Sequence, residues 1–213
     1  MLFGLTIPEL LVSLVVLLLA IPIHEWAHAW SAYQLGDDTA SLQGRLTLNP
    51  LAHLDPVGSI LILMGMLGWG KPVPVNPFRM RINPRVGMAL SAAAGPFSNF
   101  VLAMLLAIPF RLGLLSPYGG TGDLSIETFL LTAISINVGL MLFNLIPIYP
   151  LDGEKVLTGV LPPQMGDYVL RLRPFGPLIL AGVLFVLPLV GFDLVWRIIG
   201  PAQWFLEDLL LFS

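Results

Sequence analysis

The sequence has no cysteine and few charged residues. Without cysteine, the chain can form neither disulfide bonds nor thiolate metal ligands. Charged residues make up only 11% of its 213 residues, whereas a soluble domain carries about 25%. Hydrophobic residues make up 56%, and the mean hydropathy is +0.87. This composition excludes an ordinary soluble globular protein and predicts a helical membrane protein embedded in the lipid bilayer.

The chain also lacks an excess of basic residues and the features of a cleaved signal peptide. Its formal net charge is -3, which argues against nucleic acid as a partner. The first apolar run has no basic segment before it and no small-residue cleavage site before His24. We therefore expect this run to remain in the protein as a membrane-spanning helix.

Several apolar runs reach or approach the roughly 20 residues that an α-helix needs to cross a bilayer. We predict an all-α polytopic membrane protein with one membrane-embedded domain over residues 1–213. Its three-helix core falls within about 7–160, and further hydrophobic segments occupy about 166–213. The last run is broken by a Gly-Pro pair, so it either spans the membrane or lies at its surface. The expected spans are 7–35, 86–115, 125–146 and 175–192, and the last run is 194–212.

Three shorter stretches have patterns that do not fit a spanning helix. Between residues 39 and 50, apolar and polar residues alternate with a period of two, which is typical of a β-strand. The prolines within 71–77 favour an extended chain. We therefore predict a small membrane-associated β-strand or hairpin region around 39–50 and 71–77. Residues 57–68 are apolar but too few to span, so we expect a re-entrant or interfacial segment there.

The most informative motif is H-E-x-x-H, which occurs as His24-Glu25-Trp-Ala-His28. On a helix, residues four apart share a face, so His24 and His28 can bind one metal ion. Glu25 then lies beside the ion, where a metalloprotease has its general base. The residues from Leu10 to Ile23 carry no charge, so the motif falls inside an apolar helix. At 1.5 Å per residue it lies about 26 Å from the start of that helix, near the far edge of the bilayer core.

A catalytic zinc ion usually has three protein ligands and one open position, so a third ligand must come from elsewhere. Asp152 stands out, because Pro147 and Pro150 end the preceding helix and Gly153 follows without side-chain bulk. A carboxylate at membrane depth must be paired or bind a metal. The alternative role for Asp152 is the N-cap of a following helix. The other candidates are His53, Asp55, Asp123, Asp193, Glu207 and Asp208.

Basic residues indicate how the chain crosses the membrane. With the N-terminus outside, most of the 10 Lys and Arg residues fall in loops on the cytoplasmic side. This bias places the H-E-x-x-H motif and Asp152 near the cytoplasmic side of a multi-pass protein of the cell membrane. The cytoplasmic residues would be Arg45, Lys71, Arg79, Arg81, Arg85, Lys155, Arg171 and Arg173, with Arg111 and Arg197 on the other side.

These motifs resemble those of the site-2 protease family of intramembrane zinc metalloproteases, in its compact form without a PDZ or CBS domain. One matching element is the H-E-x-x-H helix, and a second is Gly95-Pro-Phe-Ser-Asn99. A third is the stretch from Asn144 to Gly153, with the pattern N-x-x-P-x-x-P-L-D-G. Gly44 to Pro50, with His53-Leu-Asp-Pro56, is also similar to compact members. The resemblance covers the predicted core.

The resemblance implies a zinc endopeptidase that hydrolyses peptide bonds in or near the transmembrane segments of other membrane proteins, in regulated intramembrane proteolysis. His24, His28 and Asp152 would bind one Zn²⁺ per chain, and Glu25 would act as the catalytic acid and base. Asn144 would hold the substrate or the developing oxyanion. The expected partners are a transmembrane protein substrate and the lipid bilayer.

Other residues near the motifs each have two interpretations. His53 is either a ligand or a neighbour of the metal site, or a structural or regulatory residue. Asn99 either supports or gates the site, or belongs to a helix kink and close helix contact with Gly95 and Pro96. Asn137 lies seven residues before Asn144 on the same helix face, and we expect it to pack between helices.

Two other functions remain open at this point. The first is a membrane-anchored zinc protease of soluble or lipidated substrates, although such enzymes usually take their third ligand from a downstream helix. The second is a non-proteolytic metal-binding membrane protein or a transporter. The presence of Glu25 argues against an inactive relative.

Overall fold

The computed structural model describes residues 7–53, 55, 70–118 and 125–212. Within these ranges, four helical stretches are long and apolar enough to cross a membrane: Leu10–Gln34, Pro84–Arg111, Ile126–Asn144 and Pro163–Leu189. The main prediction of an all-α polytopic membrane protein is thus supported. The predicted re-entrant or interfacial segment at 57–68 and the candidate ligand Asp123 lie outside the described residues.

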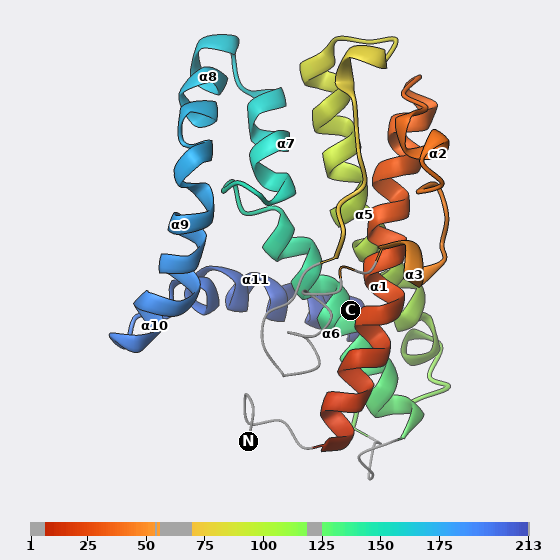
Figure 1. Cartoon of the computed structure of the whole chain (residues 1–213). Coiled ribbons are helices and arrows are strands. Elements are labelled where there is room, and N and C mark those ends of the chain that lie inside the picture. Colours follow the sequence, from red (N-terminus) through yellow and green to blue (C-terminus); the bar gives the residue numbers. More distant parts are fainter. Residues whose placement is uncertain (1–6, 54, 56–69, 119–124, 213) are drawn as a thin grey trace.

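Three long helices form the core: α1 (Ile7–Gln34), α5 (Pro84–Arg111) and α6 (Ile126–Asn144). They lie side by side, and α5 packs against both α1 and α6 (Figure 1). Small side chains let the helix backbones approach closely, as is usual between membrane helices. Ala103 and Ala107 of α5 thus pack in one buried cluster with Ile134 and Val138 of α6.

Local sequence signals set the starts of two of these helices. The Asn83 side chain accepts hydrogen bonds from the first free N–H groups of α5, and Pro84 follows in the first turn. Ser125 caps α6 by accepting from the Thr128 N–H. α6 ends at Asn144, shortly before Pro147, so the chain turns back over the end of this helix.

The chain after α6 forms a short helix and then a C-terminal arm. The short helix is α7 (Asp152–Val160), which packs against α5. The arm runs along the opposite side of the molecule from α1 (Figure 1). Its segments are α8 (Pro163–Arg171), η2 (Arg173–Phe175), α9 (Gly176–Ala181), η3 (Gly182–Val186) and α10 (Leu187–Leu189).

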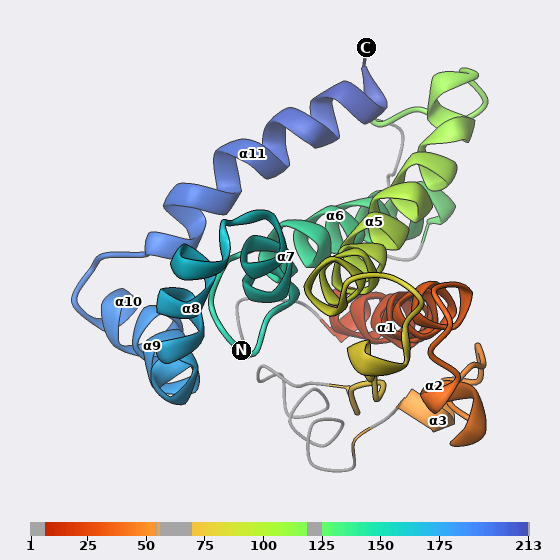
Figure 2. The ribbon, with the colours of Figure 1, turned by 90° about the horizontal axis from the view of Figure 1, so that it is seen from above.

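The last helix, α11 (Leu194–Leu211), runs crosswise to α1 and passes along α6 (Figures 1 and 2). Arg111 at the end of α5 donates hydrogen bonds to the carbonyl oxygens of Leu209 and Leu210. α11 carries Arg197, Glu207 and Asp208 and is absent from the four candidate spans of the described chain. Its direction shows that the final apolar run does not continue the bundle of parallel and antiparallel helices.

The predicted β-strand or hairpin region around 39–50 and 71–77 is wrong, since the described residues contain no strand. The alternating stretch forms two short helices, α2 (Thr39–Leu42) and α3 (Pro50–His53), joined by turns. Asp37 accepts from the Thr39 N–H and begins this turn-rich segment instead of a ladder. Residues 71–76 are extended but remain outside any sheet, because their prolines cannot donate ladder hydrogen bonds. η1 (Pro77–Arg79) follows.

Candidate active site

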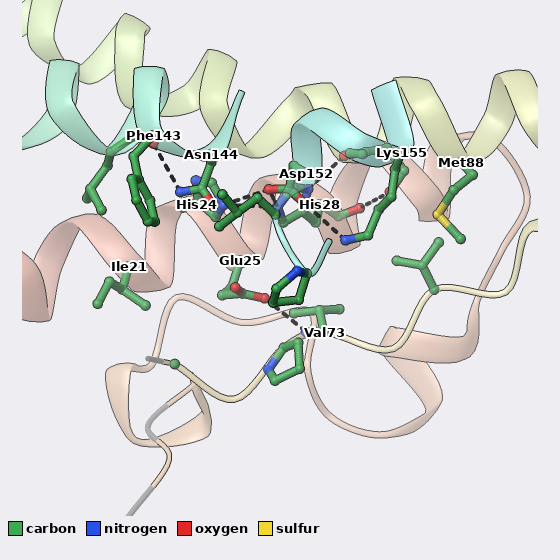
Figure 3. Close-up of a pocket in the computed structure, with 18 residues that line it drawn as sticks. Ile21, His24, Glu25, His28, Val73, Met88, Phe143, Asn144, Asp152 and Lys155 are labelled. Carbon is green, nitrogen blue, oxygen red and sulfur yellow. Dashed lines mark hydrogen bonds and ion pairs between the residues drawn. The ribbon is translucent and has the colours of Figure 1, made fainter. Parts of the chain in front are cut away.

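Two histidines and one aspartate meet where α1, α5 and α7 come together (Figure 3). His24 and His28 lie one turn apart on α1, and their Nε2 atoms are 3.0 Å apart. The Asp152 Oδ2 atom lies 3.2 Å from His24 Nε2 and 3.0 Å from His28 Nε2. All three side chains are buried. Zinc bonds of about 2.0–2.1 Å in a tetrahedron would separate ligand atoms by roughly 3.3 Å, so this donor set fits a zinc ion.

Each histidine is oriented by a hydrogen bond from its other ring nitrogen. His24 Nδ1 lies 2.6 Å from the Asn99 side-chain oxygen, and His28 Nδ1 lies 2.7 Å from the Ser91 carbonyl oxygen. A carbonyl oxygen only accepts, so each Nδ1 carries the proton and donates it. Both Nε2 atoms therefore keep a lone pair directed toward Asp152, as a metal ligand requires.

The side chain of Asn99 is itself fixed by a second asparagine. Its Nδ2 donates to Asn137 Oδ1 at 2.9 Å, and Asn137 Nδ2 donates to the Ala133 carbonyl oxygen at 2.8 Å. This chain of bonds decides which end of the Asn99 amide faces His24. It also links α6 to the metal ligands through α5, although Asn137 was expected only to pack.

Gly95 allows α5 to approach both histidines. A Cβ atom at this position would lie 2.3 Å from His28 Nε2 and 2.7 Å from His24 Nε2. Any larger residue would therefore push into the space where the imidazole rings converge. The sequence predicted a close helix contact at Gly95 and Pro96, and in the structure Gly95 lies against the two histidines themselves.

The turn after α6 presents Asp152 to the histidines. Asp152 is the first residue of α7, and Leu151, not Asp152, occupies the N-cap position. Gly153 permits the close turn, since a Cβ there would lie 2.2 Å from the Leu145 carbonyl oxygen. Lys155 Nζ donates to Asp152 Oδ1 at 2.9 Å, which leaves Oδ2 for the metal.

The carboxylate of Asp152 is held in its ionised form. Burial alone would raise its pKa, but in the zinc-free protein, where the His24 and His28 rings can take a proton at Nε2, hydrogen bonds from these rings and the nearby Lys155 ammonium group together lower the pKa well below its usual range. An ionised carboxylate is the form that binds a metal ion.

Glu25 lies beside the ligands, on the wall opposite α6 and α7 (Figure 3). Its Oε2 accepts a hydrogen bond from the Val73 N–H at 2.9 Å. Glu25 and the ligands line a cavity of about 470 Å³. Its walls are largely apolar with a few polar side chains, among them Glu25, Asn144 and Lys155, as in a substrate site. The apolar lining residues include Ile21, Val75, Met88, Leu140, Phe143 and Leu151.

Neither Asn144 nor His53 belongs to the group of residues that could bind the metal. Asn144 lines the cavity, and its Nδ2 donates to the Leu140 carbonyl oxygen at 3.0 Å. His53 is buried in α3, and its Nε2 donates to the Thr47 carbonyl oxygen at 2.7 Å. The described residues contain one group able to hold a metal ion, and it includes none of His53, Asp55, Asp193, Glu207 and Asp208.

Three contributors to the site were not predicted from the sequence. Ser91 and Val73 act through backbone groups, for which the sequence has no signal. Lys155 could have been found, because residues three apart on a helix are neighbours and it follows Asp152 at that spacing.

An H-E-x-x-H helix, a buried aspartate placed to serve as the third ligand and a glutamate outside this donor set that lines the adjoining cavity are the features of a metalloprotease-type zinc site. Comparison with known proteins agrees. The chain is 40% identical over 200 residues to "Putative zinc metalloprotease YwhC" of Bacillus subtilis (strain 168), which covers 92% of this chain and 88% of that protein. The chain therefore belongs to the zinc metalloprotease family that contains YwhC.

More distant relatives carry a similar name. "Putative zinc metalloprotease Rip2" of Mycolicibacterium smegmatis is 29% identical over 84% of this chain and 69% of that protein. The protein of the same name from Mycobacterium tuberculosis (strain ATCC 25618 / H37Rv) is 32% identical over 80% of this chain and 65% of its own length. No protein-family model and no solved structure matches the chain. Zinc is thus the cofactor, in agreement with the donor set of His24, His28 and Asp152.

Proposed function

We propose that this protein is an intramembrane zinc endopeptidase of the site-2 protease type, which hydrolyses peptide bonds in or near the transmembrane segments of other membrane proteins. The observation that carries the proposal is the place of the ligands. His24 and His28 belong to a candidate membrane span, and so does Asn99, which orients His24. The first two motifs of the family resemblance thus meet inside helices apolar enough to cross a bilayer, and the third brings Asp152 to them from α7, beyond the end of α6.

The residues have separate roles in the proposed reaction. When bound, zinc supplies a Lewis acid and lowers the pKa of water toward 7. The Glu25 carboxylate takes a proton from the attacking water and returns it to the leaving amine nitrogen. The Asn144 amide donates a hydrogen bond to the oxyanion after giving up its present bond to Leu140.

The cavity suits the class of substrate that we propose. A membrane-spanning substrate is a helix whose backbone groups are already hydrogen-bonded, so a segment of it must become extended before cleavage. The apolar cavity walls, among them Ile21, Met88 and Phe143, would receive the apolar side chains of that segment. Water reaches the ligands through the same cavity.

Basic residues support an active site near the cytoplasmic side of the cell membrane, with the N-terminus outside. Arg45, Arg79 and Arg81 lie in the connection between the end of α1 and the start of α5, and Arg85 lies in the first turn of α5. This is the end of the bundle toward which α6 rises to meet α7 (Figure 1). Basic loops remain predominantly on the cytoplasmic side.

The test uses purified full-length protein in detergent, a helical single-span substrate and the Glu25→Gln variant. We expect one zinc per chain in both proteins, cleavage by the wild type, and loss of cleavage in the variant. Cleavage by Glu25→Gln, or a wild type that binds no zinc, would refute the proposal. A soluble peptide of the same sequence tests the alternative, since efficient cleavage of that peptide alone would indicate a protease of soluble substrates.

A further inference from the structure

The extended segment from Lys71 to Asn76 passes directly over Glu25. Pro72 and Pro74 have no N–H group. Val73 therefore supplies the only backbone donor among these three residues, and that N–H points at the Glu25 carboxylate over 2.9 Å. Figure 3 shows this contact on the side of the cavity facing away from α6.

Polar groups hold this segment before and after Val73. On the N-terminal side, the Lys71 N–H donates to the His53 carbonyl oxygen at 2.8 Å, and the Arg45 guanidinium donates to the Lys71 carbonyl oxygen at 2.6 Å. On the C-terminal side, the Asn76 N–H donates to Asp37 Oδ2 at 2.6 Å. Arg45 and Asp37 are only 7% and 0% exposed, so both anchors are buried.

The anchors belong to the same part of the chain as the catalytic motif. Asp37 lies shortly after the end of α1, the helix that carries Glu25, and it also accepts hydrogen bonds from the Thr39 N–H and hydroxyl group. The two prolines further restrict the backbone between the anchors. The Val73 N–H is thereby held at a fixed position relative to α1 by contacts that do not involve Glu25.

We infer that the Val73 N–H is a positioning group for Glu25. A glutamate side chain has many rotamers when free, and a general base must be held within hydrogen-bond reach of the proton that it takes. The bond to Oε2 fixes the carboxylate and leaves Oε1 to accept the proton from water. This inference rests on the role proposed above for Glu25 as the catalytic base.

The positioning role makes a different prediction from a role in building the cavity wall. Loss of the N–H should lower kcat and leave KM and the zinc affinity close to their wild-type values. Loss of a cavity wall should instead raise KM, and loss of the fold should release zinc. Hydrogen bonds to charged groups are strong enough for an effect of about tenfold to a hundredfold on kcat.

The test replaces Val73 by proline, which removes the N–H from a residue already flanked by prolines. Val73→Ala serves as the reference for loss of the side chain, and Val75→Pro as the reference for an added proline in the same segment. We expect kcat of Val73→Pro to fall at least tenfold below both references, with KM and zinc stoichiometry retained. A kcat equal to that of the references would overturn the inference.

A second substitution decides the question if Val73→Pro does not fold. Replacing Val73 by its α-hydroxy acid exchanges only the N–H for an ester oxygen, without a ring. The same fall in kcat with zinc retained would support the inference. Full activity, or release of zinc by the ester variant, would overturn it, since release would show that the bond supports the fold and not the base.

Substitution of Glu25 separates this inference from the proposed function. Glu25→Asp shortens the side chain and breaks the bond to Val73, so Val73→Pro should cost less than twofold in that background. An equal cost in both backgrounds would overturn the positioning role alone. Full cleavage by Glu25→Gln would instead overturn the proposed function, whatever Val73→Pro does.

Discussion

The side-chain oxygen of Asn99 lies 2.6 Å from His24 Nδ1, on the far side of the imidazole ring from the metal-binding nitrogen. Because Asn137 fixes the Asn99 amide from its other end, His24 is held in the tautomer whose Nε2 can bind zinc. Which ring nitrogen of His24 carries the proton thus depends on an asparagine in each of the other two core helices.

Replacing Asn99 by alanine should weaken zinc binding by about tenfold to a hundredfold, the usual cost of losing a partner that orients a metal ligand. The affinity is measured by competition with a chelator in detergent. Asn137→Ala should have a smaller effect in the same direction, because Asn99 could still reach His24. Equal zinc affinity in wild type and Asn99→Ala would contradict the role assigned to this contact.

Replacing Gly95 by alanine should remove zinc from the protein. The added Cβ would lie 2.3 Å from His28 Nε2, and neither the ring nor the α5 backbone can yield without separating the ligands. Gly182→Ala is the matched control, because a Cβ at Gly182 meets nothing within 4 Å. Zinc content per chain checks the prediction, and a Gly95→Ala protein with full zinc would show that the helices can move apart.

Replacing Asn144 by alanine should lower kcat about a hundredfold or more while zinc remains bound, since a single oxyanion donor typically contributes that much. In the described structure its amide group bonds only to the Leu140 carbonyl oxygen of its own helix. Zinc content should therefore match the wild type. A loss of zinc together with activity would indicate that Asn144 supports the turn toward Asp152 instead.

The meeting of His24, His28 and Asp152 was predictable because each part has a local signal. Two histidines four apart require a helix to meet, and an apolar run supplies that helix. Asp152 was predictable because a carboxylate at membrane depth needs a partner and prolines end the helix before it. Pairings between helices, such as Asn99 with His24, had no such signal. Side-chain chemistry alone does not show which face of α5 turns toward α1.

The strand prediction failed for an equally specific reason. Alternation of apolar and polar residues between 39 and 50 also suits a chain of short turns over one face of a core, and Asp37 at its start favours a turn. Likewise, the extended chain at 71–76 was predictable from its prolines. Its attachment to Arg45, Glu25 and Asp37 was not, because these side chains bind backbone atoms.

The ionised state of Asp152 predicts how the zinc-free protein responds to acid. Its pKa lies below the usual value near 3.9. A carboxyl group with a lowered pKa stabilises the fold above its unfolded-state pKa, and this contribution is lost as the pH falls through the folded-state value. Asp152→Asn should therefore lower the melting temperature of the chelator-treated protein between pH 5 and 7, as followed by circular dichroism.

The difference in melting temperature between the wild type and Asp152→Asn should shrink once the pH falls below about 4, the usual range of a free aspartate. The control is Asp167→Asn, whose carboxylate is 65% exposed and lies 3.6 Å from Arg85. That variant should melt close to the wild type at every pH. A constant difference for Asp152→Asn down to pH 3 would contradict a stabilising carboxylate.

The ion pair between Glu154 and Arg173 should attach the C-terminal arm to the helix that begins with Asp152. Arg173 Nε and Nη2 donate to the two Glu154 carboxylate oxygens at 2.9 and 3.0 Å. The Glu154 side chain is only 2% exposed, whereas that of Arg173 is 41% exposed. Arg173→Met therefore leaves a buried carboxylate unpaired. Since water can partly reach it, the cost should stay below the 3–5 kcal/mol of a fully buried pair, at about 2 kcal/mol.

Thermal unfolding in detergent measures this loss, and Arg171→Met is its control. Arg171 also lies near the end of α8, but its guanidinium group stacks on the exposed Tyr168 ring, so its loss should change stability by less than about 0.5 kcal/mol. In Glu154→Gln, the further change Arg173→Met should cost much less than in the wild type, because no charge is left unpaired. Equal costs in the two backgrounds would show that Arg173 stabilises the arm through its packing on Tyr149, 5.5 Å from that ring, and not through Glu154.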